Sequence, residues 1–344
     1  MLIDWITARV PLALFSPEDL IRLRASGDRI QRYNLATGDV TWETQAWDSI
    51  RSDSHHLSFR VGSDVLWVQG SPARVIGDGD AVFGSGAAAA LDLPGCMARM
   101  GAVLCAKLML PCPPLRSWQV SRIDVTGNLL LAELASVRVA LRLLRDCEGG
   151  RYRVSQQAGD TVYWSQRSRI RAGKAYAKGP HLAYLMRKSD YDGRAYTESE
   201  ISLAGSLLRL ELRLGSQLLR ERLSKPWHEL TSTELTDYWH QYFSRMLGNI
   251  DITDMNIAER IKAVAPTPGQ AKAALMTWAL IQAEGWEKAR DLQSRPTWYR
   301  NLKLLRAAGL GDADLASGRV VALRRPLLHA QQVNSWEELR RLAA

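Results

Sequence analysis

Three short segments of the chain alternate between polar and apolar residues with a period of two. They span residues 121–126, 174–178 and 208–214. This alternation predicts half-exposed strands, because successive side chains of a strand point to opposite faces of the sheet. Asp124, Tyr176 and Glu211 stand on the polar sides of the three segments. If the strands are neighbours, two carboxylates, a phenol and several cations meet on one exposed surface.

The chemistry that such a surface favours is phosphodiester cleavage. Asp124 and Glu211 can hold a divalent ion, Mg²⁺ (or Mn²⁺), through oxygen ligands, with water completing the coordination shell. The ion would polarise a phosphoryl oxygen. The Tyr176 oxygen could then attack the phosphorus, with Lys178 or Arg209 stabilising the charge and lowering the pKa of the phenol. The resulting phosphotyrosine would keep the bond energy, so the same site could rejoin the strand.

Other tyrosines and a purely structural role compete with this interpretation. Tyr163 and Tyr184 are alternative nucleophiles, and the same alternation is typical of an ordinary sheet whose charged face meets water. A sheet that binds RNA would expose aromatic residues on its central strands, whereas these segments expose Asp, Glu, Arg and Lys. Most of the 12 tryptophans stand at apolar positions. Trp164, close in sequence to the Tyr176 segment, is the candidate for base stacking.

Positive charge is concentrated in the middle of the chain. The net charge is +9, and residues 114–225 hold 20 basic and 11 acidic residues, which is the whole excess. A field of this kind suits a polyanion, and nucleic acid is the first such partner to consider. The side chains expected to contact DNA in this part are Arg122, Arg167, Arg169, Arg171, Lys174 and Arg209.

The last third of the chain is predicted to be helical, because its apolar residues recur with a period near 3.6. Residues 271–283 form one expected helix, and a second begins at Ser294 or Arg295, with Pro296 in its first turn. The pair fits either a helix-turn-helix, whose second helix enters the major groove, or a plain amphipathic bundle. In the first case the side chains that contact DNA would be Thr297, Arg300 and Lys303.

The order of elements predicts an α+β fold: an antiparallel sheet nuclease domain with helices packed on one face, followed by a helical C-terminal domain. A strand-rich N-terminal region should pack on the nuclease sheet. After a helix near residues 130–147, strands should continue to about residue 214. The corresponding ranges are residues 1–113, 114–225 and 226–344.

Composition places the protein among globular proteins of the cytosol. No apolar run is long enough to span a membrane, so no membrane partner is expected. The N-terminus lacks the apolar core of a signal peptide. Four cysteines without CxxC spacing are expected to be reduced, buried thiols.

Several blocks of sequence are similar to those of a known family. They are SPARVIGDGDAVFG at residues 71–84, SRID at 121–124, TVYWSQRSRIRAGKAYAKGPHL at 161–182 and LLRLELRL at 207–214, with weaker likeness in PTPGQAKA and SRPTWYRNLKLLRAAG. In this order they resemble the replication initiation proteins of filamentous phages, the gene II protein family, which is related to the rolling-circle Rep nucleases of small plasmids. The blocks span most of the chain.

The resemblance implies an initiator of rolling-circle replication. Tyr176 would nick the viral plus strand at the origin, stay joined to the 5′ phosphate and free a 3′-OH primer, and the displaced strand would be rejoined. Asp124 and Glu211 match the acidic positions of the family. The wider superfamily binds metal through a His-hydrophobic-His triplet, which this sequence lacks. His181, five residues after Tyr176, is the third ligand to consider.

The resemblance also implies the partners of the protein. These are supercoiled double-stranded phage DNA at the origin, the single-stranded plus strand, and a host helicase and polymerase in the cytoplasm of the bacterial host. The main alternative is a non-catalytic DNA-binding initiator or repressor, which would keep the basic region but would not need Tyr176, Asp124 and Glu211 together. The number of subunits stays open.

Overall fold

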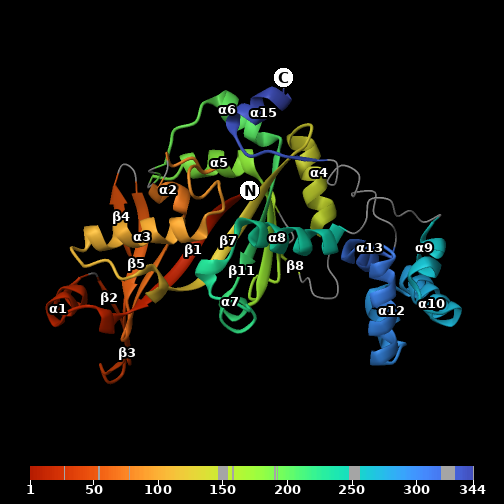
Figure 1. The fold of residues 1–344 in the computed structure, drawn as a ribbon, viewed down its shortest axis with the longest axis horizontal. Coiled ribbons are helices and arrows are strands. Elements are labelled where there is room, and N and C mark those ends of the chain that lie inside the picture. The colour runs from red at the N-terminus through yellow and green to blue at the C-terminus, as the bar shows by residue number, and fades with distance from the viewer. Residues whose placement is uncertain are drawn as a thin grey trace.

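An antiparallel sheet forms the centre of the structure, a computed structural model that describes residues 1–26, 28–52, 55–76, 78–145, 154–156, 159–189, 191, 193–247, 256–318 and 330–343 (Figure 1). In spatial order its strands are β4 (Asp48–Ser52), β5 (His55–Val61), β6 (Val65–Gly70), β1 (Leu2–Pro11), β7 (Gln119–Leu130), β11 (Leu207–Leu214), β10 (Arg171–Ala177), β9 (Thr161–Trp164) and β8 (Val154–Gln156). A short strand, β12 (Gln331–Gln332), pairs with the end of β7. The predicted α+β class with an antiparallel sheet is confirmed.

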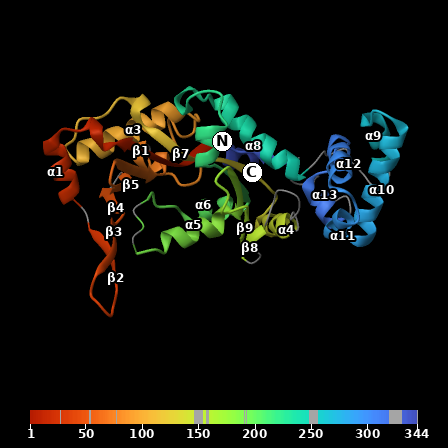
Figure 2. The same cartoon turned by 90° about the horizontal axis from the view of Figure 1, so that it is seen from below.

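One face of the sheet is apolar and is covered by helices. Alternate residues of the strands, such as Val68, Val125 and Leu210, are buried in a single core together with residues of these helices. Figure 2 shows two of the helices, α3 and α8, running along this side of the sheet. The helices that contribute to this core include α3 (Leu93–Lys107), α4 (Leu134–Arg145), α7 (Ser216–Glu221) and α8 (Ser232–Leu247).

The sheet contains strands from both of the first two domains predicted from the sequence, residues 1–113 and 114–225. β1 pairs with β6 on one side and with β7 on the other, so strands from residues 1–113 and from residues 114–225 are hydrogen-bonded into one sheet. The N-terminal strands therefore continue the sheet instead of packing on it. Two short helices of this N-terminal part are α1 (Pro17–Ala25), which the side chain of Ser16 caps, and α2 (Pro72–Ile76).

Two helices interrupt the region in which only strands were expected before residue 214. Pro180 lies in the first turn of α5 (Lys178–Met186), and a reciprocal capping box between Thr197 and Glu200 starts α6 (Glu198–Gly205). Both helices pack with α15 (Trp336–Ala343) in a small core that includes Val82 and Phe83. This group lies over one end of the second, polar face of the sheet.

The C-terminal third divides into three parts. α8 belongs to the sheet core, and residues 330–343 return to the sheet through β12 and α15. Between them, the helices of residues 256–318 form a separate apolar core at one end of the molecule, opposite the hairpin of β2 (Arg29–Tyr33) and β3 (Val40–Gln45) (Figure 1). These helices are α9 (Ile257–Val264), α10 (Pro268–Glu284), α11 (Trp286–Asp291), α12 (Arg295–Ala307) and α13 (Asp312–Ser317).

Two expectations about the whole chain can be compared with the described residues. Within those ranges, no helix has both the length and the apolar character needed to cross a membrane. Cys96 and Cys105 are free and buried, as expected, whereas Cys112 is exposed. Cys147 lies outside the described residues.

The packing of α8 on the sheet generates a test. A Cβ atom at Gly127 would lie 2.9 Å from Cζ2 of Trp239, a buried ring that cannot move freely. We expect Gly127→Ala to lower the free energy of unfolding by about 1–3 kcal/mol through overpacking, measured by urea denaturation. The matched control is Gly269→Ala at the start of α10, where no atom lies within 4 Å of the new Cβ. Equal stability of the two variants would contradict the close packing of α8.

Candidate functional site

The three polar segments predicted from the sequence are adjacent strands. β11 lies between β7 and β10. Lys174 is opposite Glu211 and Tyr176 is opposite Arg209 in the β10–β11 register, while Arg213 is opposite Asp124 in the β11–β7 register. Because partners in register point to the same face, these side chains gather on the polar face of the sheet.

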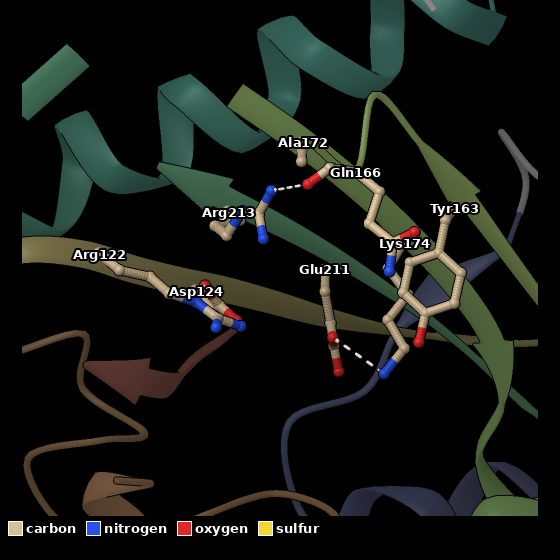
Figure 3. Close-up of a pocket in the computed structure, with 9 residues that line it drawn as sticks. Arg122, Asp124, Tyr163, Gln166, Ala172, Lys174, Glu211 and Arg213 are labelled. Atoms are coloured by element: carbon tan, nitrogen blue, oxygen red, sulfur yellow. Dashed lines mark hydrogen bonds and ion pairs between the residues drawn. The ribbon is translucent and has the colours of Figure 1, made fainter. Parts of the chain in front are cut away.

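A cavity of about 270 Å³ opens on this face (Figure 3). Most of its lining is charged or polar, and both carboxylates singled out in the sequence contribute to it. Tyr163, from the neighbouring strand β9, also lines the cavity, whereas Tyr176 does not. The full lining is Arg122, Asp124, Tyr163, Gln166, Ala172, Gly173, Lys174, Glu211 and Arg213.

Tyr176 lies beside the cavity and is buried, with 2% of its surface exposed. Its hydroxyl donates a hydrogen bond of 2.6 Å to Oε1 of Glu211, and Nζ of Lys174 lies 4.0 Å from the centre of its ring. Burial and the charge of Glu211 raise the pKa of Tyr176 well above its usual value. The expectation that basic neighbours lower this pKa is therefore wrong, because the opposing effect of Arg209 is smaller.

Glu211 is the ionised partner of this pair. Burial alone would raise its pKa, but Lys174, whose Nζ lies 3.4 Å from Oε2, Arg209 and the hydrogen bond from Tyr176 together lower the pKa to about 2. Glu211 is therefore a carboxylate at neutral pH, the form that accepts the hydrogen bond of the Tyr176 hydroxyl.

The two cations expected to assist the tyrosine occupy different positions. Lys178 is the first residue of α5, is 1% exposed and has its Nζ 5.7 Å from the centre of the Tyr176 ring. Burial, with Arg209 nearby, lowers the pKa of Lys178 well below its usual value. Arg209 is completely buried, so the prediction that it contacts DNA does not agree with its position.

Arg209 instead ties the sheet to a loop from the first third of the chain. Its Nε donates to Oδ1 of Asn128 at 2.9 Å, and its Nη atoms donate to the carbonyl oxygens of Ala81 and Val82. Asp80 holds that loop, because its carboxylate accepts hydrogen bonds from the backbone N–H of Val82 and Phe83 and from the side chains of Tyr196 and Trp336.

Asp4 is a member of the site that the sequence analysis missed. It lies in an irregularity of β1 between Ile3 and Trp5, and its Oδ1 is 3.7 Å from Nη1 of Arg209. Burial and the nearby carboxylate of Glu211 raise the pKa of Asp4, although Arg209 lowers it in part. The available signal was an acidic residue inside the otherwise apolar start of the first strand.

Asp124 and Glu211 line the same cavity, but with His181 they do not form a set of three metal ligands. Both carboxylate oxygens of Asp124 accept hydrogen bonds from Arg122, at 2.9 and 2.5 Å. His181 lies on α5 with its ring 4.7 Å from that of Tyr176, and its Nδ1 makes no hydrogen bond within the described part of the chain. No three His, Cys, Asp or Glu side chains of the described residues are placed to hold an ion. This arrangement does not fit the predicted set Asp124, Glu211 and His181.

The remaining residues predicted to contact DNA fall into two groups. Arg167 and Arg169 are exposed in the loop between β9 and β10, Lys174 lines the cavity, and the side chain of Arg122 is 39% exposed. Arg171 does not agree with the prediction, because it lies on the other face of β10, 4.9 Å from the centre of the Tyr238 ring of α8.

Two aromatic residues singled out in the sequence also lie away from the cavity. Tyr184 is on the outer side of α5, with 59% of its surface exposed. Trp164 is completely buried beside Phe243 of α8, so it cannot stack on a base from this position.

The two C-terminal helices predicted from the sequence do not directly follow each other. α11 lies between α10 and α12, so the two helices expected to follow each other are separated by a third. On α12, Arg300 and Lys303 are exposed and Thr297 is partly exposed. These three residues remain available for contact with DNA, which stays a prediction.

The fold and the cavity define an α+β protein with a tyrosine, carboxylates and cations clustered on the open face of an antiparallel sheet. The family model for the N-terminal part of the phage replication-associated protein, the gene II protein, matches residues 2–243. The chain therefore belongs to this family, and the predicted membership of the gene II protein family is confirmed.

Two individual proteins give further comparisons. The replication-associated gene II protein of Enterobacteria phage I2-2 is 25% identical over 330 residues, which cover 91% of this chain and 88% of the relative. A rolling circle replication initiator protein from Geobacillus stearothermophilus aligns over 93% of this chain and 97% of its own, with 10% identity and a TM-score of 0.28. So low a score carries no argument about the fold.

The loop that holds Arg209 generates a test of how the site is supported. We expect Asp80→Ala to lower the free energy of unfolding by about 2–4 kcal/mol, because each buried donor left unpaired costs about 1–3 kcal/mol. Urea denaturation measures the loss, and protease cleavage near residues 330–343 reports release of the C-terminal segment. Asp39→Ala in the exposed turn of the β2–β3 hairpin is the control. If both variants unfold alike, Asp80 does not hold the loop.

Proposed function

We propose that this protein initiates rolling-circle replication of a phage genome by acting as a site-specific DNA endonuclease and strand transferase. The observation that carries the proposal is the hydrogen bond from the Tyr176 hydroxyl to an ionised Glu211, beside a cavity lined by basic side chains. Membership of the phage replication-associated protein family supports the same activity. The proposed substrate is the viral plus strand at the origin.

The nicking step follows from the positions of these two side chains. The Tyr176 oxygen attacks the phosphorus while its proton passes to Glu211, so a Tyr–O–P bond forms and the bond from phosphorus to the 3′ oxygen breaks. The 3′ oxygen takes up a proton from water and becomes the 3′-OH primer. Rejoining is the reverse reaction, in which a 3′-OH attacks the phosphotyrosine and Tyr176 recovers its proton from Glu211.

Cations around the pair have separate roles in this proposal. Lys174 lines the cavity and also lies over the Tyr176 ring. A DNA phosphate that pairs with Lys174 would draw this side chain off the ring and give the tyrosine access to the phosphorus. Arg213, which also lines the cavity, would stabilise the charge that develops on the phosphoryl oxygens.

Tyr163 is a second candidate for the nucleophile. It lines the cavity directly, and its ring lies 5.8 Å from Nζ of Lys174. Tyr176 is favoured because its hydroxyl already donates to the carboxylate that would accept its proton, and because it stands in the segment that carries the resemblance to the family. The two assignments predict opposite effects on nicking when each tyrosine is replaced alone.

The first test compares tyrosine variants on supercoiled replicative-form phage DNA that carries the origin. We expect wild type and Tyr163→Phe to nick the DNA and leave protein on the 5′ end, and Tyr176→Phe to nick at background level because it lacks the attacking oxygen. Gel analysis and labelling of the blocked end measure both products. Loss of nicking in Tyr163→Phe alone would assign the nucleophile to Tyr163. If all three proteins bind the DNA and none nicks it, the protein is a non-catalytic initiator or repressor.

The second test concerns the proton acceptor. We expect Glu211→Gln to lower the nicking rate by about 10²- to 10⁴-fold, because the amide keeps a hydrogen-bond acceptor but cannot take the proton. Single-turnover nicking measures the rate, and DNA affinity is measured separately. Glu221→Gln at the exposed end of α7 is the matched control. A rate within about threefold of wild type would exclude Glu211 as the base.

Dependence on Mg²⁺ or Mn²⁺ stays a prediction and has its own measurement. Nicking is followed after removal of divalent ions with EDTA and after each ion is added back. Loss and recovery of nicking would support the predicted metal dependence, and nicking that persists in EDTA would contradict it.

A further inference from the structure

A row of arginine and tryptophan side chains crosses the polar face of the sheet away from the cavity. In the β1–β6 register Arg9 is opposite Trp67, and in the β5–β6 register Trp67 is opposite Arg60. Arg9 is also opposite Gln119 of β7, and Trp47 directly precedes β4 at the far end. We use the name Arg–Trp row for Gln119, Arg9, Trp67, Arg60 and Trp47.

The side chains of the row are stacked on one another. The Arg9 guanidinium lies 5.3 Å from the centre of the Trp67 ring, and the Arg60 guanidinium lies 6.0 Å from Trp67 and 5.2 Å from Trp47. Cation–π contacts of this kind orient an arginine without removing its charge. The row therefore holds two fixed positive charges on a surface with aromatic residues.

The charges of the row differ from those of several other arginines in the sheet region, which are paired with carboxylates. Arg122 is paired with Asp124, Arg138 with Asp160 and Arg194 with Glu200. Neither Arg9 nor Arg60 has an acidic partner among the described residues. Nε of Arg9 donates a hydrogen bond of 3.0 Å to the neutral Oε1 of Gln119, and Nε of Arg60 makes no hydrogen bond within the described part of the chain. These two cations are therefore available to an anionic ligand.

The row belongs to the part of the polar face that remains accessible. Arg9, Trp67 and Arg60 are partly exposed, and Trp47 is 39% exposed. α3 packs on the opposite face of these strands, with its buried residues in the same core as Phe59 and Val68. Figure 2 shows α5 and the β2–β3 hairpin on the side of the sheet away from α3 and α8. Trp47 lies in the chain between the end of β3 at Gln45 and the start of β4 at Asp48.

The row also leads toward the cavity. Arg122 lies farther along β7 than Gln119, on the other side of the irregularity in the pairing of β7 with β1. Its guanidinium lies 5.7 Å from the centre of the Trp5 ring, and its side chain lines the cavity. Cationic and aromatic side chains thus continue from β5 through β6, β1 and β7 to the cavity, on one face of one sheet.

We propose that the Arg–Trp row binds single-stranded DNA that leads to or from the cavity, with phosphates on Arg9 and Arg60 and a base stacked on Trp47. Unpaired cations beside exposed aromatic rings match the phosphates and the bases of a single strand, whereas the bases of a duplex are already stacked on one another. The proposal rests on the proposed function in one respect, because the strand that the row binds is taken to be the strand that the protein cleaves.

The test measures equilibrium binding in a Tyr176→Phe background, so its outcome does not depend on cleavage. The probe is fluorescein-labelled oligodeoxythymidine, which has no origin sequence, and a duplex of the same length is measured beside it. Arg9→Gln combined with Arg60→Gln should weaken binding of the single strand by about tenfold or more. The slope of log affinity against log salt should fall by about 0.7 for each phosphate that the variant no longer binds.

Substitution of Trp47 tests stacking separately from charge. Trp47→Ala should weaken single-strand binding by at least about fivefold, with little change in the salt slope, because stacking is not a counterion effect. Circular dichroism checks that each variant is folded. In a second measurement, photocrosslinking of a bromodeoxyuridine-substituted strand should label peptides that contain Trp47 or Trp67.

The control is Arg99→Gln on the exposed side of α3, which removes one positive charge from the opposite face of the sheet. It should bind the single strand like the parent protein. The proposal is overturned if the double arginine variant binds the single strand normally, if Arg99→Gln weakens binding equally, or if only duplex binding responds. Failure of nicking with intact binding by the row would instead count against the proposed function alone.

Discussion

The guanidinium of Arg209 lies in the interior of the protein, and the candidate site is built around it. An arginine without partners would be too costly to bury, because its charge loses the hydration of water. Here it is compensated by Asn128, by the carbonyl oxygens of Ala81 and Val82 and by the nearby Asp4. The sheet, the loop and the first strand must therefore come together for this residue to be buried.

That requirement explains why segments distant in the sequence meet at one end of the sheet. Asp80 holds the loop that supplies the carbonyl oxygens, and its carboxylate accepts a hydrogen bond from Nε1 of Trp336 in the C-terminal segment. α15 and α6 close over the same place. Together with Lys174, Arg209 lowers the pKa of Glu211, which accepts the Tyr176 hydrogen bond. Arg209 thus both supports the fold and contributes to the electrostatics of the site.

The strands and their faces were predictable because a period of two fixes the side on which each residue lies. The sequence therefore indicated correctly that Asp124, Tyr176 and Glu211 share a face. It also led to errors, in that strands were expected where α5 and α6 form, and Arg171 was expected to contact DNA although it lies on the face of β10 that meets α8. Asp4 was missed because the irregularity in β1 that positions it depends on pairing with β7.

By itself the sequence determined the class of fold, the polar faces of the central strands and the concentration of positive charge, since these follow from local alternation and composition. Only the tertiary structure decided which charges are buried and which are free. Arg209 and Arg60 each stand on a polar strand face, yet Arg209 is enclosed by a loop and Arg60 stacks on two aromatic rings. Burial depends on segments far along the chain, so no local pattern could distinguish the two.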